Sequence, residues 1–315
     1  MIETPDSDNL PTSSETDGAQ PSDAPSPSKC SNAKLRPGLY IVATPIGNLS
    51  DLTERAYDIL ATVSLVACED TRVTGKLLSS RGIRTKLVAY HDHTPQSVRD
   101  GLIESLKNGE TVALASDAGT PLVSDPGYKL VAAAIEADIH VTAAPGPASP
   151  LAALVLSGLP TDRFLFGGYL PSKEKARREV IREFAALRAT LIFLESPRRL
   201  TSSLSALASH LGDRAASVAR ELTKVHEEVV RGRLSELAEK YFREGQPRGE
   251  VVIVIGPPER APPDDEDIDT LLDGALSRMS LRDAADAVAS ATGAPKKYVY
   301  RRALEVKRRT ASGGE

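Results

Sequence analysis

The stretch LYIVATPIGNL, residues 39–49, decides the fold of this chain. It begins as a continuous apolar run, which is typical of a strand buried on both faces of a parallel sheet, and it ends in a Pro-Ile-Gly-Asn turn. Further apolar runs of this kind, separated by stretches with helical periodicity, follow at 64–70, 86–91, 111–116 and 139–145. We therefore predict an N-terminal α/β domain at 38–158, with helices on both faces of a mostly parallel sheet.

A second alternation of strands and helices follows the stretch SGLPTDRFLFGGYLPSK at 157–173, whose Pro and Gly content is typical of an interdomain connection. A charged helix is expected at 173–188, and strands at 190–196, 216–223 and 250–256. The sequence thus predicts a second α/β domain at 163–257, a Pro-rich acidic linker at 258–269 and a basic helical module at 270–310.

The negative net charge of the chain arises in its N-terminal segment. Residues 1–34 hold six of the 43 acidic residues and two of the 39 basic ones, so the formal net charge of -4 arises there and the remainder is neutral. Because residues 1–37 are also poor in large apolar side chains, we predict that they form a disordered tail. A neutral average still allows local basic surfaces, so an anionic partner is not excluded.

The cysteine content and the apolar runs limit the class of protein. Two cysteines, Cys30 and Cys68, are too few for a disulfide framework or a four-thiolate zinc site. No run approaches the roughly 18 apolar residues of a membrane span, and the N-terminus lacks the basic-then-apolar order of a signal peptide. The sequence therefore predicts a cytoplasmic protein with no membrane segment.

Three unusual loops follow strands of the first predicted sheet: TPIGNL at 44–49, SDAGTPLVSDPG at 116–127 and APGPAS at 144–149. The carboxyl ends of parallel strands meet at one edge of a sheet, where ligands of α/β folds bind, so the three loops indicate a single pocket. Asp117 could accept hydrogen bonds from a ribose or an amino group there, or Asp117 or Asp125 could merely cap the next helix. The glycine spacings of a dinucleotide-binding loop and of a Walker A loop are absent, so a nicotinamide dehydrogenase and a P-loop nucleotidase are disfavoured.

Six motifs together resemble a known family. They are LYIVATPIGNLSDLTERA, CEDTR (68–72), AYHDH (89–93), SDAGTPLVSDPGY (116–128), FLESPRRL (193–200) and ARELTKVHEE (219–228). In this order they closely resemble the ribosomal RNA small subunit methyltransferase I family, the 2′-O-ribose methylase branch of the tetrapyrrole methylase fold. The resemblance covers about residues 38–256, with a weaker match to the C-terminal helical module of the family.

The resemblance implies an activity, a cofactor and partners. Members use S-adenosylmethionine, bound in the cleft between two α/β domains, to methylate the ribose of a cytidine in the decoding region of 16S rRNA. The fold is commonly a homodimer. Transferred motif by motif, the cofactor site is expected to comprise Pro45, Asp117, Ala118, Gly119, Thr120, Ala148, Ser149 and Leu194.

Methyl transfer from a sulfonium to a ribose hydroxyl is an in-line displacement that requires alignment and no metal. A general base would help, and the candidates are Glu69, Glu221 and Lys224. Glu69 could act as a carboxylate base or form a structural ion pair with Arg72. Lys224 could act as a base only if burial lowered its pKa; otherwise Lys224 and Arg220 would hold RNA phosphate.

Basic side chains in several regions are expected to contact RNA phosphate. They are Arg72, Arg198, Arg199, Arg220, Lys296, Lys297, Arg301 and Arg302, with Lys173, Lys175, Arg177 and Arg178 as a further group. A solvated basic helix end is the alternative for the C-terminal residues, and a solvated helix face is the alternative for the group at 173–178.

The motif His91-Asp92-His93 could suggest a metal site. In a strand His91 and His93 would share one side and Asp92 would point to the other, so substrate contact or a polar strand end is favoured and no metal is expected.

Two other functions remain open from the sequence. The same fold serves methylation of tetrapyrroles and of a modified histidine in a protein, although a basic C-terminal module favours RNA. A non-catalytic RNA binder of ribosome assembly would not need an intact cofactor loop, and the intact SDAGTP loop disfavours that interpretation.

Overall fold

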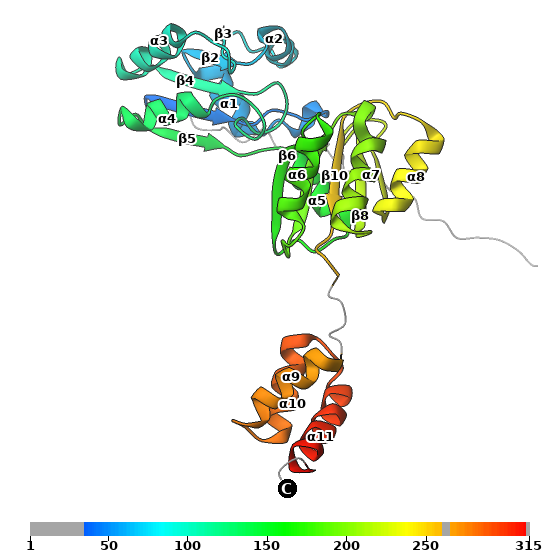
Figure 1. The fold of residues 1–315 in the computed structure, drawn as a ribbon. Coiled ribbons are helices and arrows are strands. Elements are labelled where there is room, and N and C mark those ends of the chain that lie inside the picture. Colours follow the sequence, from blue (N-terminus) through cyan, green and yellow to red (C-terminus); the bar gives the residue numbers. More distant parts are fainter. Residues whose placement is uncertain (1–34, 260–264, 313–315) are drawn as a thin grey trace, which may run out of the picture. The chain divides into compact units, whose positions relative to one another are not determined.

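The computed structural model describes residues 35–259 and 265–312 (Figure 1). The predicted tail at 1–37 lies almost wholly outside these residues. The first sheet has the order β3-β2-β4-β1-β5, and every neighbouring pair is parallel. Its strands are β1 (Gly38–Val42), β2 (Leu65–Cys68), β3 (Lys86–Ala89), β4 (Thr111–Ala115) and β5 (Val141–Ala144). The connecting segments contain η1 (Leu49–Asp51), α1 (Glu54–Thr62), α2 (Thr71–Ser80), α3 (Gln96–Lys107) and α4 (Tyr128–Glu136).

The central strands of this sheet are buried, as their continuous apolar sequences predict. Leu39 and Val42 of β1 and Val112 of β4 have no exposed surface, because helices cover both faces. The predicted α/β fold class is confirmed.

The second domain contains a mixed sheet of order β6-β7-β10-β8-β9, in which only β6 and β7 are parallel. Its elements are α5 (Ser149–Ser157), β6 (Phe164–Tyr169), α6 (Glu174–Phe184), β7 (Thr190–Glu195), η2 (Pro197–Arg199), α7 (Leu200–Leu211), β8 (Ala215–Arg220), β9 (Glu228–Arg233), α8 (Leu234–Glu244) and β10 (Val251–Ile255). Phe193 of β7 and Leu204 of α7 lie fully buried in its core.

Two strands of this sheet are missing from the sequence-based prediction. Strand β6 lies inside the stretch 157–173 that its glycines suggested to be a connection. Gly167 is there for packing, since a Cβ at this position would lie 2.4 Å from the ring of Phe193. Strand β9 has the sequence EVVRGR, whose charges are typical of an edge strand and hide it from a hydrophobicity pattern.

Helix α5 also differs from the prediction, which places it in the first domain. Ala153 and Leu154 of α5 are buried in one cluster with Ile192, Val252 and other side chains of the second sheet. The guanidinium of Arg231 on β9 donates to the last carbonyls of α5, including that of Ser157 at 3.2 Å. The helix therefore packs as part of the second domain.

The C-terminal module consists of α9 (Asp265–Leu276), α10 (Leu281–Thr292) and α11 (Lys296–Ser312). Helix α9 begins inside the predicted linker at 258–269. The acidic residues that suggested a linker occupy its first turn, where their negative charges interact favourably with the helix dipole and stabilise the helix. Ile268, Leu272 and Val299 form a separate small core. Among the described residues, no helix is both long and apolar enough to cross a membrane.

Candidate active site

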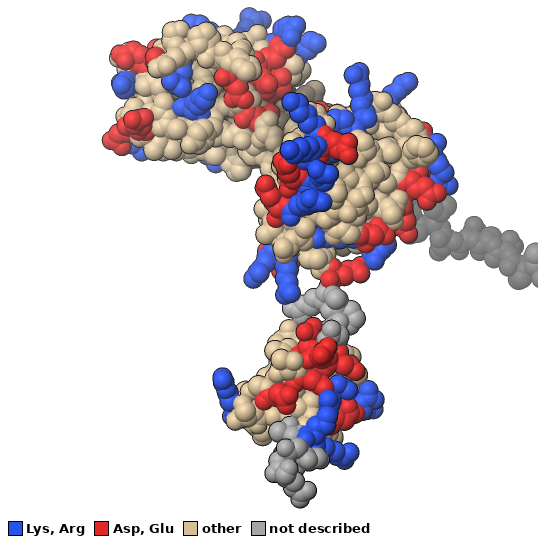
Figure 2. All heavy atoms as spheres, in the orientation of Figure 1, with Lys and Arg blue, Asp and Glu red and all other residues tan. Residues whose placement is uncertain are grey.

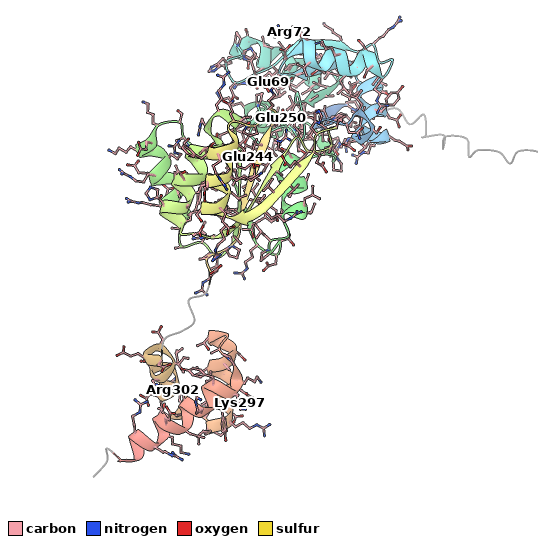
Figure 3. All side chains as sticks on the ribbon, turned by 90° about the vertical axis from the view of Figure 1, so that its right-hand side faces the viewer. Glu69, Arg72, Glu244, Glu250, Lys297 and Arg302 are labelled. Carbon is pink, nitrogen blue, oxygen red and sulfur yellow. The ribbon has the colours of Figure 1, made fainter. Side chains whose placement is uncertain are left out.

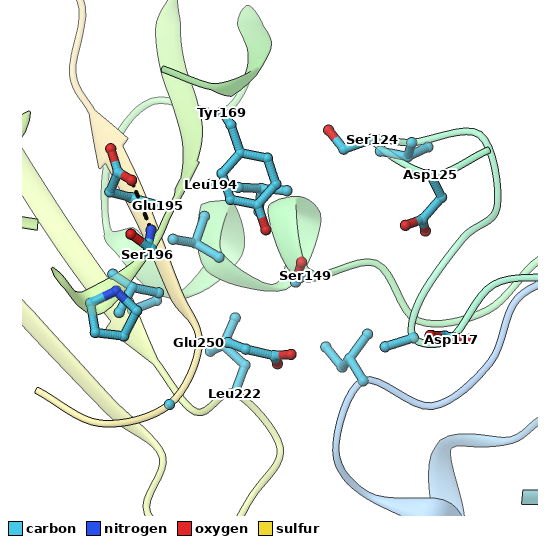
Figure 4. A pocket seen from close by; sticks show the side chains of 18 residues that line it. Asp117, Ser124, Asp125, Ser149, Tyr169, Leu194, Glu195, Ser196, Leu222 and Glu250 are labelled. Carbon is cyan, nitrogen blue, oxygen red and sulfur yellow. Dashed lines mark hydrogen bonds between the residues drawn. The ribbon is translucent and has the colours of Figure 1, made fainter. Parts of the chain in front are cut away.

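A cavity of about 410 Å³ lies at the carboxyl ends of the first-domain strands and is lined on its other side by second-domain residues (Figure 4). Its apolar wall includes Ile46, Leu194 and Leu222. Its polar wall includes Asp117, Ser124, Asp125, Ser149, Tyr169 and Glu250. A cavity with apolar walls and a few convergent polar groups is the usual form of a small-molecule site.

The three loops singled out from the sequence meet at this cavity. The amide of Thr44 donates to the carbonyl of Gly119 at 2.8 Å, and the amide of Gly119 donates back to the carbonyl of Thr44 at 3.0 Å. The hydroxyl of Thr120 donates to the carbonyl of Pro147 at 3.1 Å, and this hydrogen bond connects the second loop to the third. Gly119 has a φ of +86°, a conformation that glycine adopts without strain.

The predicted cofactor residues divide into two groups. Asp117, Ala118, Ser149 and Leu194 line the cavity. Pro45, Gly119, Thr120 and Ala148 do not line it; Gly119 and Thr120 connect the loops by hydrogen bonds, and at the end of β1 the wall is formed by Ile46 rather than Pro45.

The second-domain wall contains residues that the sequence analysis missed. They include Tyr169, Ser196, Pro197, Gly249, Glu250 and Val251. Gly249 has a φ of +96°, and a Cβ there would lie 2.2 Å from the carboxyl group of Glu221, so this position requires glycine. Only the folded chain shows that the start of β10 faces the first domain.

Lys224 belongs to a network of charges beside this wall. Its ammonium group lies 2.8 Å from Glu221 Oε1 and 3.1 Å from Glu250 Oε2. Partial burial lowers the pKa of Lys224, but the hydrogen bonds to the two carboxylates outweigh this effect and leave that pKa above its ordinary value. The prediction of Lys224 as a base required a lowered pKa, and this condition is not met. Glu221, also a candidate, has its pKa lowered by the hydrogen bond from Lys224 and is a weaker base.

A second cavity of about 640 Å³ adjoins the first, and Asp117 lines both. Its other lining residues include Glu69, whose pKa is raised by burial and by the nearby Asp117 and Asp92 carboxylates. The predicted alternative of a Glu69–Arg72 ion pair is not formed, because Arg72 binds Asp70 at 2.6 Å.

Asp70 is the N-cap of α2, which begins at Thr71. Its carboxylate accepts from the amide and the guanidinium of Arg72, and these hydrogen bonds lower the pKa of Asp70 to about 2. The amide of Asp70 donates to Asp117 Oδ1 at 3.1 Å. The Arg72 side chain, labelled in Figure 3, is 85 % exposed and lies at the rim of the second cavity.

The basic residues of the second domain have different surroundings. Arg199 donates to the carbonyls of Leu170 and Pro171 and to Glu195, and Arg220 pairs with Glu228 at 3.1 Å, so both stabilise the fold. Arg198 is exposed. Figure 2 shows further Lys and Arg side chains gathered over α6, mixed with acidic ones; α6 carries the predicted Lys175, Arg177 and Arg178, and Lys173 is its N-cap.

In the C-terminal module, Arg302 likewise forms ion pairs within the fold. It lies 2.7 Å from Asp269, and its side chain is 17 % exposed. Lys296 pairs with Asp286 at 3.2 Å, whereas Lys297 and Arg301 are exposed (Figure 3 labels Lys297 and Arg302).

The motif His91-Asp92-His93 lies in a turn after β3, not in the strand. The prediction that its side chains alternate between two faces is therefore wrong. Within residues 35–259 and 265–312, no group of three or more His, Cys, Asp or Glu side chains is arranged to hold a metal ion.

Comparisons with known proteins agree with this geometry. The family model described as Tetrapyrrole (Corrin/Porphyrin) Methylases matches residues 38–238, and the RsmI C-terminal HTH domain model matches 262–307. Solved structures with the same fold include a diphthine synthase (TM-score 0.54, 16 % identity, 69 % of this chain and 89 % of that chain) and a uroporphyrin-III-C-methyltransferase from Thermus thermophilus (TM-score 0.50, 22 % identity, 70 % of this chain and 94 % of that chain). The fold and the cavity thus define a methylase of the tetrapyrrole methylase class.

Sequence relatives narrow this class. Proteins named ribosomal RNA small subunit methyltransferase I are similar in Mesorhizobium japonicum (50 % identity, 89 % of this chain and 95 % of the relative) and in Erythrobacter litoralis (51 % identity, 87 % and 96 %). A relative of the same name in Escherichia coli O157:H7 is 44 % identical over 85 % of this chain and 94 % of its own length. The chain belongs to the ribosomal RNA small subunit methyltransferase I family, as the six motifs predicted.

Proposed function

We propose that this protein uses S-adenosylmethionine to methylate the ribose 2′-hydroxyl of a cytidine in the decoding region of 16S rRNA, in the cytoplasm. The observation that carries the proposal is the acid-lined cavity at the strand ends, in a chain half identical to proteins named as small-subunit rRNA methyltransferases. The cytidine, the 2′-oxygen and the decoding region come from the family resemblance.

The cavity suits the proposed cofactor chemically. S-adenosylmethionine carries a sulfonium and an ammonium cation, which the carboxylates of Asp117, Asp125 and Glu250 complement. Its adenine requires an apolar surface, which Ile46 and Leu222 offer. The bound cofactor would supply an electrophilic methyl group.

The residues of the chain would contribute alignment and proton transfer. The Thr44–Gly119 hydrogen bonds connect two loops of the cavity wall, and positioning of the reactants can supply about 7 to 11 kcal/mol of a barrier. Glu69 lines the adjoining cavity, so its carboxylate is placed to accept the proton of a hydroxyl held there. Because burial raises the pKa of Glu69, it is a stronger base than a solvated glutamate.

Cofactor affinity is expected to fall in mild acid. Burial and the nearby Glu69 and Asp117 carboxylates raise the pKa of Asp125 to about 6, so Asp125 is anionic above that pH and neutral below it. A cationic ligand binds the anionic form better, so the dissociation constant should increase up to about tenfold between about pH 7.5 and about pH 5. Calorimetric titration measures this change. Asp125→Asn should flatten the profile, and an equally steep profile in that variant would contradict the assignment.

RNA binding is proposed to involve the C-terminal module through its exposed cations, Lys297 and Arg301. A chain ending at Gly256 should bind RNA more weakly, and the log–log slope of its salt dependence should flatten by about 0.7 for each single-strand phosphate that the module neutralises. Filter binding at several salt concentrations tests this. The double variant Lys297→Ala, Arg301→Ala tests these two cations in a module that stays folded, because both side chains lie outside its core. Superimposable binding curves would exclude a role for the module.

A homodimer is proposed on the same resemblance, and α5 supports it. This helix is apolar all round, yet Leu151 and Val155, one turn apart, are 49 % and 72 % exposed. Light scattering should give twice the mass of one chain, and Val155→Asp should give the mass of one chain.

The reaction itself is tested with tritiated S-adenosylmethionine and 30S subunits that lack their native methylations, followed by nuclease mapping of the label. Label on a ribose 2′-oxygen of a cytidine supports the proposed function. A protein that binds the cofactor but transfers no label to these subunits would instead act on a tetrapyrrole or protein substrate, or bind RNA without catalysis.

A further inference from the structure

Three cavities follow one another along the carboxyl edge of the first sheet. Asp117 lines both the proposed cofactor cavity and the second cavity. His91 and Asp92 line both the second cavity and a third one of about 260 Å³. Because neighbouring cavities share residues, a bound chain molecule can extend from the methyl donor outward past the turn at 91–93.

The turn at 91–93 presents unused hydrogen-bonding groups on a fixed backbone. The amide of His91 donates to Thr94 Oγ1 at 2.7 Å, and the amide of Thr94 donates to the carbonyl of His91 at 2.9 Å. The side chains of His91, Asp92 and His93 are exposed, and none makes a hydrogen bond or an ion pair within the described ranges 35–259 and 265–312. The two imidazoles lie on either side of Asp92 in the chain, with ring centroids 6.4 Å apart.

We propose that His91, Asp92 and His93 recognise the base of the target nucleotide as cytosine, an inference that rests on the proposed function. The pairing edge of cytosine presents one amino donor followed by two acceptors, N3 and O2. A carboxylate is the usual protein acceptor for the cytosine amino group, and imidazole N–H groups can donate to N3 and O2. Uracil places a carbonyl oxygen where cytosine has its amino group, so Asp92 would repel it.

The order of residues along the second cavity supports this orientation. Asp117 marks the end that opens onto the cofactor cavity, so the reacting ribose belongs at that end. In the parallel order β3-β2-β4, Glu69 follows β2, Asp117 follows β4 and the turn at 91–93 follows β3, so Glu69 lies between the two ends. A nucleoside with its ribose beside Glu69 therefore has its base directed to the turn at 91–93.

The third cavity suits the adjoining nucleotide. Tyr128, 75 % exposed, offers an aromatic face for stacking, and Arg99 and Lys129 line the same cavity and can neutralise phosphate. These cations, together with the exposed Arg72, offset the acidic character of the second cavity along the path of an RNA backbone.

The test compares cytidine with uridine at the methylated position, in 30S subunits reconstituted from transcribed 16S rRNA. The wild type is expected to favour cytidine in kcat/KM, and Asp92→Asn should reduce this preference about 10- to 100-fold, because an amide can either accept from cytosine or donate to uracil. Asp92→Glu, which keeps a carboxylate, should restore part of the preference. Asp162→Asn, an exposed Asp outside all three cavities, is the matched control and should leave the preference unchanged.

The outcomes separate this inference from the proposed function. If the wild type methylates cytidine and Asp92→Asn keeps the full preference while binding the cofactor normally, the inference is overturned and the function stands. A wild type that methylates cytidine and uridine equally also overturns it. No methylation of either substrate by a wild type that binds the cofactor overturns the proposed function itself.

Discussion

Asp117→Asn is expected to weaken binding of S-adenosylmethionine about 10- to 100-fold. Asp117 is the carboxylate shared by the cofactor cavity and the adjoining one. Asparagine keeps an oxygen that can accept from the amide of Asp70, so the loop is preserved and only the negative charge is removed. A hydrogen bond to a charged group contributes roughly 1.5 to 3 kcal/mol, which sets the size of the effect.

Isothermal calorimetry measures this change, and circular dichroism verifies that the variant is folded. Asp162→Asn, the exposed Asp in the connection before β6, should bind the cofactor like the wild type. A folded Asp117→Asn protein with wild-type affinity would remove this loop from the cofactor site.

Gly249→Ala is expected to lower the free energy of unfolding by about 1 to 3 kcal/mol and to impair cofactor binding as well. The φ of +96° strains any side chain there, and the new Cβ would lie 2.2 Å from the Glu221 carboxyl group. Glu221 would have to move, although it accepts from Lys224 Nζ and from the amide of Glu250. Because Gly249 and Glu250 line the cavity, its wall would move too.

Gly245→Ala is the matched control for this substitution. Gly245 has a φ of +83° after α8, but a Cβ there would meet nothing within 4 Å. Chemical denaturation of both variants separates backbone strain from steric displacement. Equal decreases in stability, with unchanged cofactor affinity in Gly249→Ala, would show that the contact with Glu221 has no effect on the cavity.

The first domain could be predicted from sequence because its strands are mostly apolar and three of them, β1, β4 and β5, end in loops rich in Gly and Pro. This pattern located β1 and the loops around Asp117 and Ser149 without knowledge of any distance. The prediction was weaker in the second domain, where the glycines of β6 and the charges of β9 disguise two strands.

The site could be predicted only on the side where local sequence builds it. Asp117 follows a strand, and its neighbours mark a loop. Glu250, by contrast, reaches the cavity because β10 pairs with β7 and β8, which are distant in sequence. The raised pKa of Lys224 could not be predicted from the sequence either. It depends on two carboxylates, and one of them, Glu250, is 26 residues away in the chain.

The packing of α5 on the second sheet determines where the chain passes from the first domain to the second. Since α5 packs on β9 and on the second sheet, the chain crosses between the domains at the Pro-Gly-Pro segment before Ser149, not at the connection at 158–163. Ser149 lies in the wall of the cofactor cavity, and Pro147 accepts from Thr120 of the Asp117 loop. The segment that connects the two domains is therefore continuous with the wall of the cofactor cavity.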